Sequence, residues 1–553
     1  MQRRTIVKRF IEDFHGEHFD VIVIGGGITG AAIAYEAASR DLSVALFEKG
    51  DFSHATSSAT SKLIHGGMRY LANLEYGLVR ESLRERRTME NIAPNFVYPF
   101  PMLMAHTASP LKNNKWVVRS GMITYDLLAY DKARTWDASK KIPNHRTLTA
   151  REALSLQPNL KREDLTGASV FYDCVSIFPE RLTLAFVKSA LAWGARVSNY
   201  ARVEDFLLSG RHQVTGVRVK DLLSGKEHEV HGSLVINCGG PWADLILGLA
   251  RQEGIGEKLV RSEGIHIITK KELIRGSHVV GSMTAKGRHF FLIPWRGHTL
   301  IGTTDKKYTG NPDDYRVTKA SILELIDEVN ASFGDGSLRY EDVQYSYGGL
   351  RPLVEEQTAE TYTSSRRYEI YDNATDGLDG LITVEGGKYT TSRNLAENTL
   401  NLVWEKTGWP MGQSVSGRRY LQGCRIREVE AFVTQARRDH PDFAPETMEY
   451  LARNYGTEYG RIVSLARQDR SLSEVVTHDG EILAEVVHAV RDEMALTLPD
   501  IVLRRTGIGT LGNPGDEVLE KVAHLAGHEL GWNQDRVARE LTDTLSILRV
   551  PSE

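Results

Sequence analysis

The segment Phe19-Asp-Val-Ile-Val-Ile-Gly-Gly-Gly-Ile-Thr-Gly30 constrains the fold most strongly, because it predicts a buried strand that runs directly into a glycine turn and a helix. Gly25, Gly27 and Gly30 have the G-x-G-x-x-G spacing. In such a unit the first glycine permits the tight turn, the second lets the backbone approach a pyrophosphate, and the third allows close packing of helix on strand. The helix predicted next would present its N-terminal amides and dipole to that pyrophosphate.

A second strand is predicted over residues 42–47, and it is followed by Glu48. This is the place of the acid that accepts hydrogen bonds from an adenosine ribose, and such an acid argues against a 2′-phosphorylated nucleotide. The alternative is an α/β turn whose glycines only pack. The strand, the spacing and the acid together favour a dinucleotide site, but they do not separate FAD from NAD.

Length and composition narrow the class of protein. A chain of 553 residues is too long for one core, so two or three domains are expected. The net charge of -4 suggests no nucleic-acid partner. Cys174, Cys238 and Cys424 are too far apart for a metal site or a disulfide framework, which fits a reducing compartment.

The sequence predicts a cytoplasmic or peripheral protein, because it contains neither a long apolar stretch nor a signal peptide. Residues 1–18 combine basic and apolar side chains at helical spacing. This segment could anchor the chain peripherally to anionic lipid at the inner face of the cell membrane. The alternative is a helix packed on the first domain, because Glu12, Asp13 and Glu17 dilute the positive charge.

The run from Asp51 to Tyr70 is rich in Ser, Thr and Gly and predicts a loop beside the cofactor. Gly66 and Gly67 would allow backbone to lie against a flat ring. Residues 237–244 and 381–390 each predict a further strand, glycine turn and helix start near the nucleotide.

The expected fold is α/β and α+β: a Rossmann-like nucleotide-binding domain interleaved with a β-rich substrate domain, followed by an all-α domain. Strands at 201–208, 213–220 and 227–236 predict an antiparallel insertion that returns to the parallel sheet. C-terminal helices are expected at 426–438, 445–455, 481–494, 517–530 and 534–548. The predicted boundaries are an N-terminal segment 1–18, a nucleotide-binding domain 19–95 with 168–260 and 378–412, a substrate domain 96–167 with 261–377, and a helical domain 415–553.

Seven motifs together resemble the FAD-dependent, aerobic-type glycerol-3-phosphate dehydrogenase family over essentially the whole chain. They are Gly25-Gly-Gly-Ile-Thr-Gly30, Ala55-Thr-Ser-Ser-Ala-Thr-Ser-Lys-Leu-Ile-His-Gly-Gly-Met-Arg-Tyr-Leu71, Gly239-Gly-Pro-Trp242, Ile301-Gly-Thr-Thr-Asp305, Gly348-Gly-Leu-Arg-Pro-Leu353, Gly386-Gly-Lys388 and Leu503-Arg-Arg-Thr506. The resemblance implies FAD as cofactor and oxidation of sn-glycerol 3-phosphate to dihydroxyacetone phosphate. It also implies that the electrons pass to a membrane quinone. A homodimer is one oligomeric state compatible with the sequence.

The resemblance also assigns residues to the chemistry. A dianionic phosphate requires guanidinium and ammonium groups, and Arg69, Arg351, Arg366 and Lys388 match the family's positions, with Tyr70 beside the substrate. His266 matches the family's active-site histidine and could take the proton of the C2 hydroxyl. Alternatively, a histidine between isoleucines is a core residue, and Arg351 could hold the substrate oxygen instead.

The cofactor contacts are assigned in the same way. Lys388 and the helix start after Thr390 would offset negative charge on reduced flavin. By resemblance the cofactor-binding residues are Gly25, Gly27, Gly30, Glu48, Ser61, Lys62, Leu63, Val203, Trp242, Asp305, Gly387, Lys388, Tyr389 and Thr390.

The chain departs from the family pattern in two places. The family usually has threonine, tyrosine and arginine near the last helix start, whereas this chain has Thr391-Ser-Arg393, and Tyr389 could replace the tyrosine's ring contact. The family's substrate-binding arginine is usually followed by an acid, whereas here Arg366 is followed by Arg367.

Three other functions compete with this interpretation. A glycerol-3-phosphate oxidase would have the same active site but pass electrons to oxygen, and such oxidases typically carry an insertion that is not obvious here. An amine or amino-acid oxidase would share the flavin fold. The third alternative is a nucleotide-binding regulator without catalysis.

Overall fold

The strand before the glycine turn, β1 (His18–Ile24), lies at the centre of the first sheet in the computed structural model. The model describes residues 9–71, 73–108, 114–210, 213–250, 259–270, 272–284, 287–334, 336–353 and 367–552. Strand β1 pairs in parallel with β2 (Val44–Phe47) and β10 (Glu227–Asn237). Strand β7 (Arg196–Ser198) extends the parallel sheet beyond β2, and β18 (Leu381–Gly386) extends it beyond β10.

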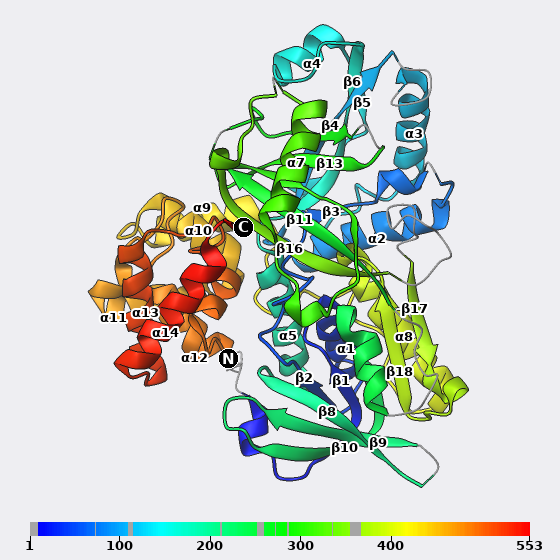
Figure 1. Ribbon diagram of the computed structural model, residues 1–553, viewed down its shortest axis with the longest axis vertical. Coiled ribbons are helices and arrows are strands. Elements are labelled where there is room, and N and C mark those ends of the chain that lie inside the picture. Colours follow the sequence, from blue (N-terminus) through cyan, green and yellow to red (C-terminus); the bar gives the residue numbers. More distant parts are fainter. Residues whose placement is uncertain are drawn as a thin grey trace.

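Alternation along β1 decides what covers each face of this sheet. Val21 and Val23 belong to the core with α1 (Ile28–Ala38), α5 (Pro179–Ala192) and α8 (Ser392–Thr407). Ile22 and Ile24 belong to the core formed with β8 (Ala201–Leu208) and β9 (Val214–Asp221). Strand β9 is antiparallel to β8 and β10, so the predicted β insertion is confirmed. Figure 1 shows α1 and α5 beside the parallel strands, with β8 to β10 below them.

The second sheet is mostly antiparallel and lies above the first in Figure 1. Its strands are β3 (Leu63–Ile64), β4 (Val97–Thr107), β5 (Arg146–Thr149), β6 (Leu165–Ser176), β11 (Val260–Thr269), β12 (Val279–Met283), β13 (His289–Trp295), β14 (His298–Gly302), β15 (Lys306–Tyr308) and β16 (Val343–Leu353). Helices α2 (Tyr76–Ile92), α3 (Lys115–Leu128), α4 (Ala150–Leu156) and α7 (Lys319–Ser332) accompany it, and α6 (Ala243–Leu247) follows β10.

Two strands join a sheet that the predicted grouping does not give them. Strand β6 pairs along its length with β4 of the second sheet, and β17 (Tyr368–Asp372) pairs with β18 of the first. Strands β4 and β6 are far apart in sequence, so no local pattern reveals their pairing. Strands β17 and β18 are joined by the short segment 373–380, and their antiparallel pairing adds β17 to the edge of the first sheet. The domain boundaries themselves stay a prediction.

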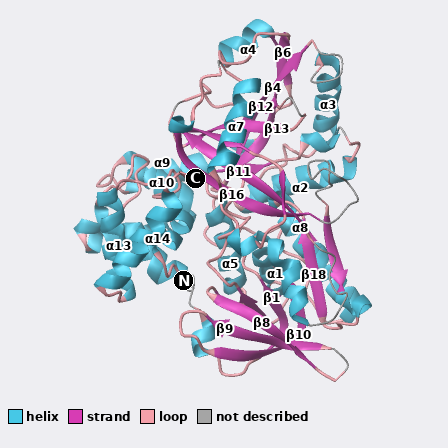
Figure 2. Cartoon of the chain, viewed as in Figure 1, coloured by secondary structure: helices cyan, strands magenta, loops and turns pink. Residues whose placement is uncertain are grey.

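The C-terminal region is helical, as expected, and lies to the left of both sheets in Figure 1. Its helices are α9 (Val429–Asp439), α10 (Pro445–Tyr455), α11 (Tyr459–Gln468), α12 (Ala484–Glu493), α13 (Asp516–Leu530) and α14 (Gln534–Leu548), with a π-helical turn at Asp500–Arg505. Helix α11 is not among the predicted helices, because it follows α10 after a single short turn. Figure 2 shows this region without strands.

The start of the described chain packs on the first sheet. Ile11 is buried, and the ring of Phe10 contacts those of Phe14, Phe19 and Phe47. These contacts favour the packed interpretation for residues 9–14, whereas residues 1–8 lie outside the described residues. Within the described ranges, no helix combines the length and apolar composition needed to cross a bilayer.

The glycine turn generates the first prediction. A Cβ at Gly30 would lie 1.9 Å from the Gly25 carbonyl oxygen. We therefore expect Gly30→Ala to lower the free energy of unfolding by roughly 3 kcal/mol or more and to reduce cofactor content. Gly77→Ala is the control, because nothing lies within 4 Å of its added Cβ, and it should change stability by less than about 1 kcal/mol. Urea unfolding measures both, and equal stability of the two variants would contradict the assigned role of Gly30.

Candidate functional site

One cavity of about 1000 Å³ lies where the two sheets meet. The three predicted glycine turns, at Gly25, Gly239 and Gly386, all line it. The opposite wall comes from the second sheet and includes His266 and Arg351. Segments that are hundreds of residues apart therefore surround a single space, and that space is large enough for a dinucleotide and a small substrate.

The first glycine turn brings backbone close to backbone. Gly25 has φ +106°, and a Cβ there would lie 2.5 Å from the Cys238 carbonyl oxygen. The backbone amide of Ile28 at the start of α1 donates to Ser57 Oγ over 2.9 Å. A hydroxyl and a helix N-terminus thus meet beside Gly27, which suits a pyrophosphate.

Glu48 lines the cavity as predicted, directly after β2. Its Oε2 accepts from the Gly26 amide at 2.6 Å, and its Oε1 accepts from the Gly50 amide at 2.7 Å. Each oxygen can accept a further hydrogen bond, so the carboxylate is held in place to receive ribose hydroxyls.

Val203 and Trp242 line the same end of the cavity. The Trp242 Nε1–H donates to Asp313 Oδ1 over 2.9 Å, and Lys49 Nζ lies 4.0 Å from the Trp242 ring centre. An apolar strand residue and a fixed indole therefore line the cavity together with Glu48.

His266 lies on the wall opposite the glycine turns. It is buried, its Nε2 lies 2.8 Å from Ser61 Oγ, and its ring stacks on Tyr347 with centres 5.0 Å apart. The buried Nδ1 has no hydrogen-bond partner among the described residues. Burial, together with the cations Arg351 and Lys62, holds the pKa of His266 well below its ordinary value of 6.5. The imidazole is therefore neutral near pH 7 and can accept a proton.

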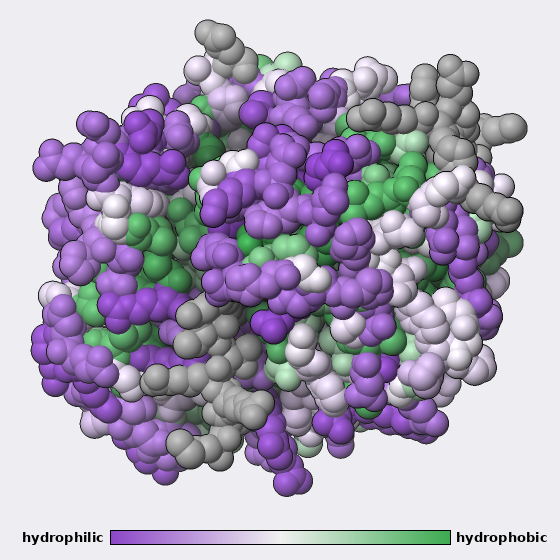
Figure 3. Space-filling view, turned by 90° about the horizontal axis from the view of Figure 1, so that it is seen from below, coloured by the Kyte–Doolittle hydropathy of each residue, from purple (hydrophilic) through white to green (hydrophobic). Residues whose placement is uncertain are grey.

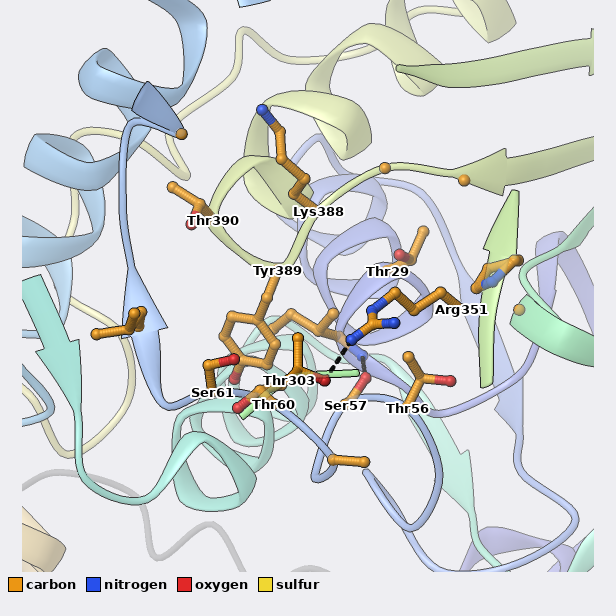
Figure 4. Close-up of a pocket in the computed structure, with 18 of the residues that line it drawn as sticks. Thr29, Thr56, Ser57, Thr60, Ser61, Thr303, Arg351, Lys388, Tyr389 and Thr390 are labelled. Atoms are coloured by element: carbon orange, nitrogen blue, oxygen red, sulfur yellow. Dashed lines mark hydrogen bonds between the residues drawn. The ribbon is translucent and has the colours of Figure 1, made fainter. Parts of the chain in front are cut away.

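Arg351 reaches the same space because Gly264 leaves room for its guanidinium. Strands β11 and β16 pair His266 with Tyr347 and Gly264 with Gly349. A Cβ at Gly264 would lie 2.0 Å from Arg351 Nη2. The guanidinium donates to Thr303 Oγ1 over 2.6 Å (Figure 4). It also donates to the carbonyl oxygens of Glu263 and Thr304.

Asp305 lines the cavity and offsets the charge of this guanidinium. Its Oδ2 lies 3.9 Å from Arg351 Nη1, and its Oδ1 accepts from Ser262 Oγ over 2.8 Å. Burial lowers the pKa of Arg351, whereas Asp305 raises it. Asp305 thus stabilises the charged arginine at the place where the motif predicted a cofactor contact.

Lys388, Arg69 and Tyr70 form a second cationic group on the cavity wall. Lys388 Nζ lies 4.7 Å and the Arg69 guanidinium 4.8 Å from the Tyr70 ring centre. Lys388 Nζ also donates to Ser82 Oγ over 2.5 Å, and Figure 4 shows the side chain directed away from Arg351. Burial lowers the pKa of Lys388 to about 8.

The turn after β18 contributes Gly387, Tyr389 and Thr390 to the lining. Thr390 Oγ1 accepts from the His65 amide over 3.2 Å, which joins this turn to the predicted loop. The Tyr389 hydroxyl donates to the Pro179 carbonyl oxygen over 2.6 Å. Only the ring of Tyr389 is therefore presented to the cavity.

Three predicted residues behave differently from the rest: Lys62, Gly30 and Arg366. Ser61 and Leu63 line the cavity, but the side chain of Lys62 between them does not, because its Nζ forms a buried ion pair with Glu180 at 2.7 Å. Gly30 packs inside the α1 turn. Arg366 lies outside the described residues.

Ser57, His65 and Thr303 line the cavity but were not singled out from the sequence. The signal was present, because all three fall inside motifs used for the resemblance. The motifs do not show where each side chain points. The fold of the loop decides which hydroxyl lies beside the start of α1 and which lies beside Arg351.

Comparison with known proteins gives two family matches and several relatives. Residues 20–393 match the model described as FAD dependent oxidoreductase, and residues 413–537 match the C-terminal domain of alpha-glycerophosphate oxidase. A glycerol-3-phosphate dehydrogenase of Mycobacterium leprae is 34% identical, covering 96% of this chain and 88% of its own. One of Synechocystis is 32% identical, covering 95% of each chain.

A solved structure extends the comparison to three dimensions. The glycerol-3-phosphate dehydrogenase from Bacillus halodurans, complexed with FAD, superposes with a TM-score of 0.78 at 26% identity. The match covers 97% of this chain and 96% of that one. The similarity therefore includes both sheets and the helical region.

Proposed function

The chain belongs to the family of FAD-dependent glycerol-3-phosphate dehydrogenases, and we propose that it oxidises sn-glycerol 3-phosphate to dihydroxyacetone phosphate. The observation that carries this proposal is the single cavity, which joins the glycine turns of a dinucleotide site to His266, Arg351, Arg69 and Lys388. The glycine turns suit binding of the cofactor. The cations suit binding of the substrate phosphate, and the neutral imidazole suits removal of a proton from the substrate.

FAD is the cofactor, and the lining residues fit it. Glycines stand where a Cβ would collide with neighbouring backbone, a helix start faces the cavity, and Glu48 is placed for the ribose. When bound, FAD supplies a flavin ring that accepts the hydride from C2 of the substrate. Thr390, Gly387 and the ring of Tyr389 would border that ring from the β18 turn.

Binding of the substrate rests on the cationic side chains. A phosphate dianion is attracted to guanidinium and ammonium groups, and Arg351, Arg69 and Lys388 line the cavity on the side of the second sheet and α2. Because Thr303 and two carbonyl oxygens fix the Arg351 side chain, it can orient the substrate as well as attract it.

His266 would take the C2 hydroxyl proton as hydride leaves. Its ring orientation is fixed by Tyr347 and Ser61, and its lowered pKa keeps it unprotonated at neutral pH. Arg351 would stabilise the developing alkoxide, since it lines the same wall. The two candidates for the C2 oxygen therefore have complementary roles.

We further propose that the electrons pass from the flavin to a quinone, which reaches the cavity from a membrane surface. Several apolar side chains of the second sheet and α3 also line the cavity, and we refer to them as the apolar lobe: Met102, Met104, Val117, Phe171 and Phe291. An apolar lobe suits a lipophilic acceptor better than a soluble one. A glycerol-3-phosphate oxidase would need no such lobe, since oxygen is small.

Helix α3 borders this lobe and carries exposed apolar residues. The exposed fraction is 69% for both Trp116 and Leu127, and Lys115 and Arg119 on the same helix are exposed cations. Apolar and basic groups together suit peripheral contact with anionic lipid. The opposite end of the molecule, seen in Figure 3, is largely hydrophilic, with hydrophobic residues in separate areas.

Arg351→Ala tests the substrate site. We expect it to raise KM for glycerol 3-phosphate, lower kcat and reduce kcat/KM by roughly 100-fold, because phosphate binding no longer positions C2. Arg261→Ala is the matched control: this arginine of β11 pairs with Asp244 at 2.5 Å and does not line the cavity. Steady-state dye reduction measures both variants. Wild-type kinetics of Arg351→Ala would contradict the assignment.

The pH dependence of kcat/KM tests His266. The free enzyme needs a neutral imidazole, and a pKa lowered from 6.5 keeps it neutral at more acidic pH. We therefore expect kcat/KM to stay level from neutral pH down to 6.5 and to fall only below that value. His266→Asn should lose this limb and roughly 10²–10⁴-fold in rate. A wild-type limb above pH 6.5 would refute the neutral-base role.

Trp116→Ser with Leu127→Ser tests the α3 surface and the acceptor together. Dye reduction in solution should stay within about twofold of wild type, whereas binding to anionic vesicles and quinone reduction in them should fall roughly tenfold. Trp404→Ser, at a 56% exposed residue of α8, is the control. Unchanged vesicle binding would exclude α3 as the contact surface. Stoichiometric peroxide in air would instead favour the oxidase.

A further inference from the structure

The motif Leu503-Arg-Arg-Thr506 has no place in the cavity. Within the described C-terminal region, 413–552, no residue lines it. Arg505 is nevertheless buried and Arg504 is largely so, and both pair with an acid of the nucleotide-binding region, Asp51. Arg504 and Arg505 therefore lie outside the cavity but beside the loop that follows Glu48.

Asp51 is the centre of this contact. Its Oδ1 accepts from Arg505 Nη2 at 2.7 Å and from Asn199 Nδ2 at 3.0 Å. Its Oδ2 accepts from Arg505 Nη1 at 2.8 Å and from Arg504 Nε at 2.7 Å. Although burial raises the pKa of this carboxyl, the two arginines lower it to about 2, so it is ionised.

The arginines are themselves held by the C-terminal region. Arg505 Nε donates to the Glu493 carbonyl oxygen over 2.8 Å, and Arg504 Nη2 donates to Asp500 Oδ1 over 2.5 Å. Both arginines lie in the π-helical turn Asp500–Arg505, a rare geometry that often marks functional positions. The fork of Arg505 therefore approaches Asp51 in a fixed orientation.

The two residues that follow Asp51 contact the glycine turn. The next residue, Phe52, is buried, and a Cβ at Gly26 would lie 2.7 Å from its ring. The Ser53 amide donates to the Gly26 carbonyl oxygen over 3.1 Å. On either side of this short segment, Glu48 and Ser57 face the cavity. A displacement of Asp51 would thus move both the ribose acid and the hydroxyl at the helix start.

We propose that Arg505, assisted by Arg504, is a positioning residue for FAD, through which the C-terminal helical region holds the loop 48–57 in its binding conformation. This inference rests on the proposed cofactor but not on the substrate or the acceptor. Without the ion pair, the loop would sample other conformations, and FAD binding would have to order it, which lowers affinity.

The test is release of FAD from the holoenzyme, followed by flavin fluorescence after dilution, without substrate or acceptor. Arg505→Lys replaces the bidentate fork by a single ammonium, and we expect FAD to leave roughly tenfold faster, equivalent to about 1.4 kcal/mol. The midpoint of urea unfolding is measured on the same samples, and kcat at saturating FAD should remain within about twofold of wild type.

Arg296→Lys is the matched control. Arg296 is also buried and also joins the C-terminal region, since its Nη2 lies 2.5 Å from Glu481 Oε1 and its Nη1 2.6 Å from Thr510 Oγ1. It lies in the turn between β13 and β14 and makes no hydrogen bond to Asp51. It should lose stability but release FAD within about twofold of the wild-type rate.

Arg504→Gln is the second variant, for the case in which Arg505→Lys does not fold. It removes one of the four hydrogen bonds to Asp51 and should give a release rate between those of the control and Arg505→Lys. Equal release from the Asp51-linked variants and Arg296→Lys would overturn the inference. Wild-type protein that purifies without flavin would instead refute the cofactor assignment.

Discussion

Close contact of backbone with backbone at the carboxyl ends of three parallel strands is the constraint on which the rest of the structure depends. A Cβ at Gly25 would collide with Cys238, and one at Gly30 would collide with Gly25. Because glycine tolerates this approach, β1, β2 and β10 end at one edge of the sheet, where the chain leaves β1 toward α1. Open α/β sheets bind ligands at such an edge. The position of the cavity thus depends on glycines, which have no side chain where the backbone segments meet.

The second sheet completes the site by the same means. Alternation in β11 and β16 places His266 and Arg351 on the face toward the cavity, and Gly264 and Gly302 leave room for the two side chains. A Cβ at Gly302 would lie 2.1 Å from His266 Cδ2. The antiparallel ladder therefore aligns an imidazole and a guanidinium that are 85 residues apart in sequence, and the strand pairing fixes their relative position.

The sequence is informative where the signal is local. Hydrophobic period and turn residues predict the strand–glycine–helix turn, the β insertion and five C-terminal helices, and the motifs contain nearly half of the residues that line the cavity. The sequence does not show where a side chain points or which distant strands pair. Lys62 turns toward Glu180, and the Tyr389 hydroxyl toward Pro179, because α5 packs against them. Helix α3 and the place of β6 in the second sheet likewise depend on tertiary contacts.

The ion pairs between Asp51 and the C-terminal region have an energetic cost. Burying charges is expensive, and well-packed apolar residues could hold two surfaces together at least as firmly as Asp51, Arg504 and Arg505 do. Apolar packing, however, tolerates small sliding, whereas a bidentate guanidinium accepts only one arrangement of its carboxylate. In the proposed FAD site, the loop that contains Asp51 holds Glu48 and Ser57 toward the cavity, each at a different part of a long cofactor. A charged contact suits that requirement better than an apolar one, because the need is for geometry more than for stability.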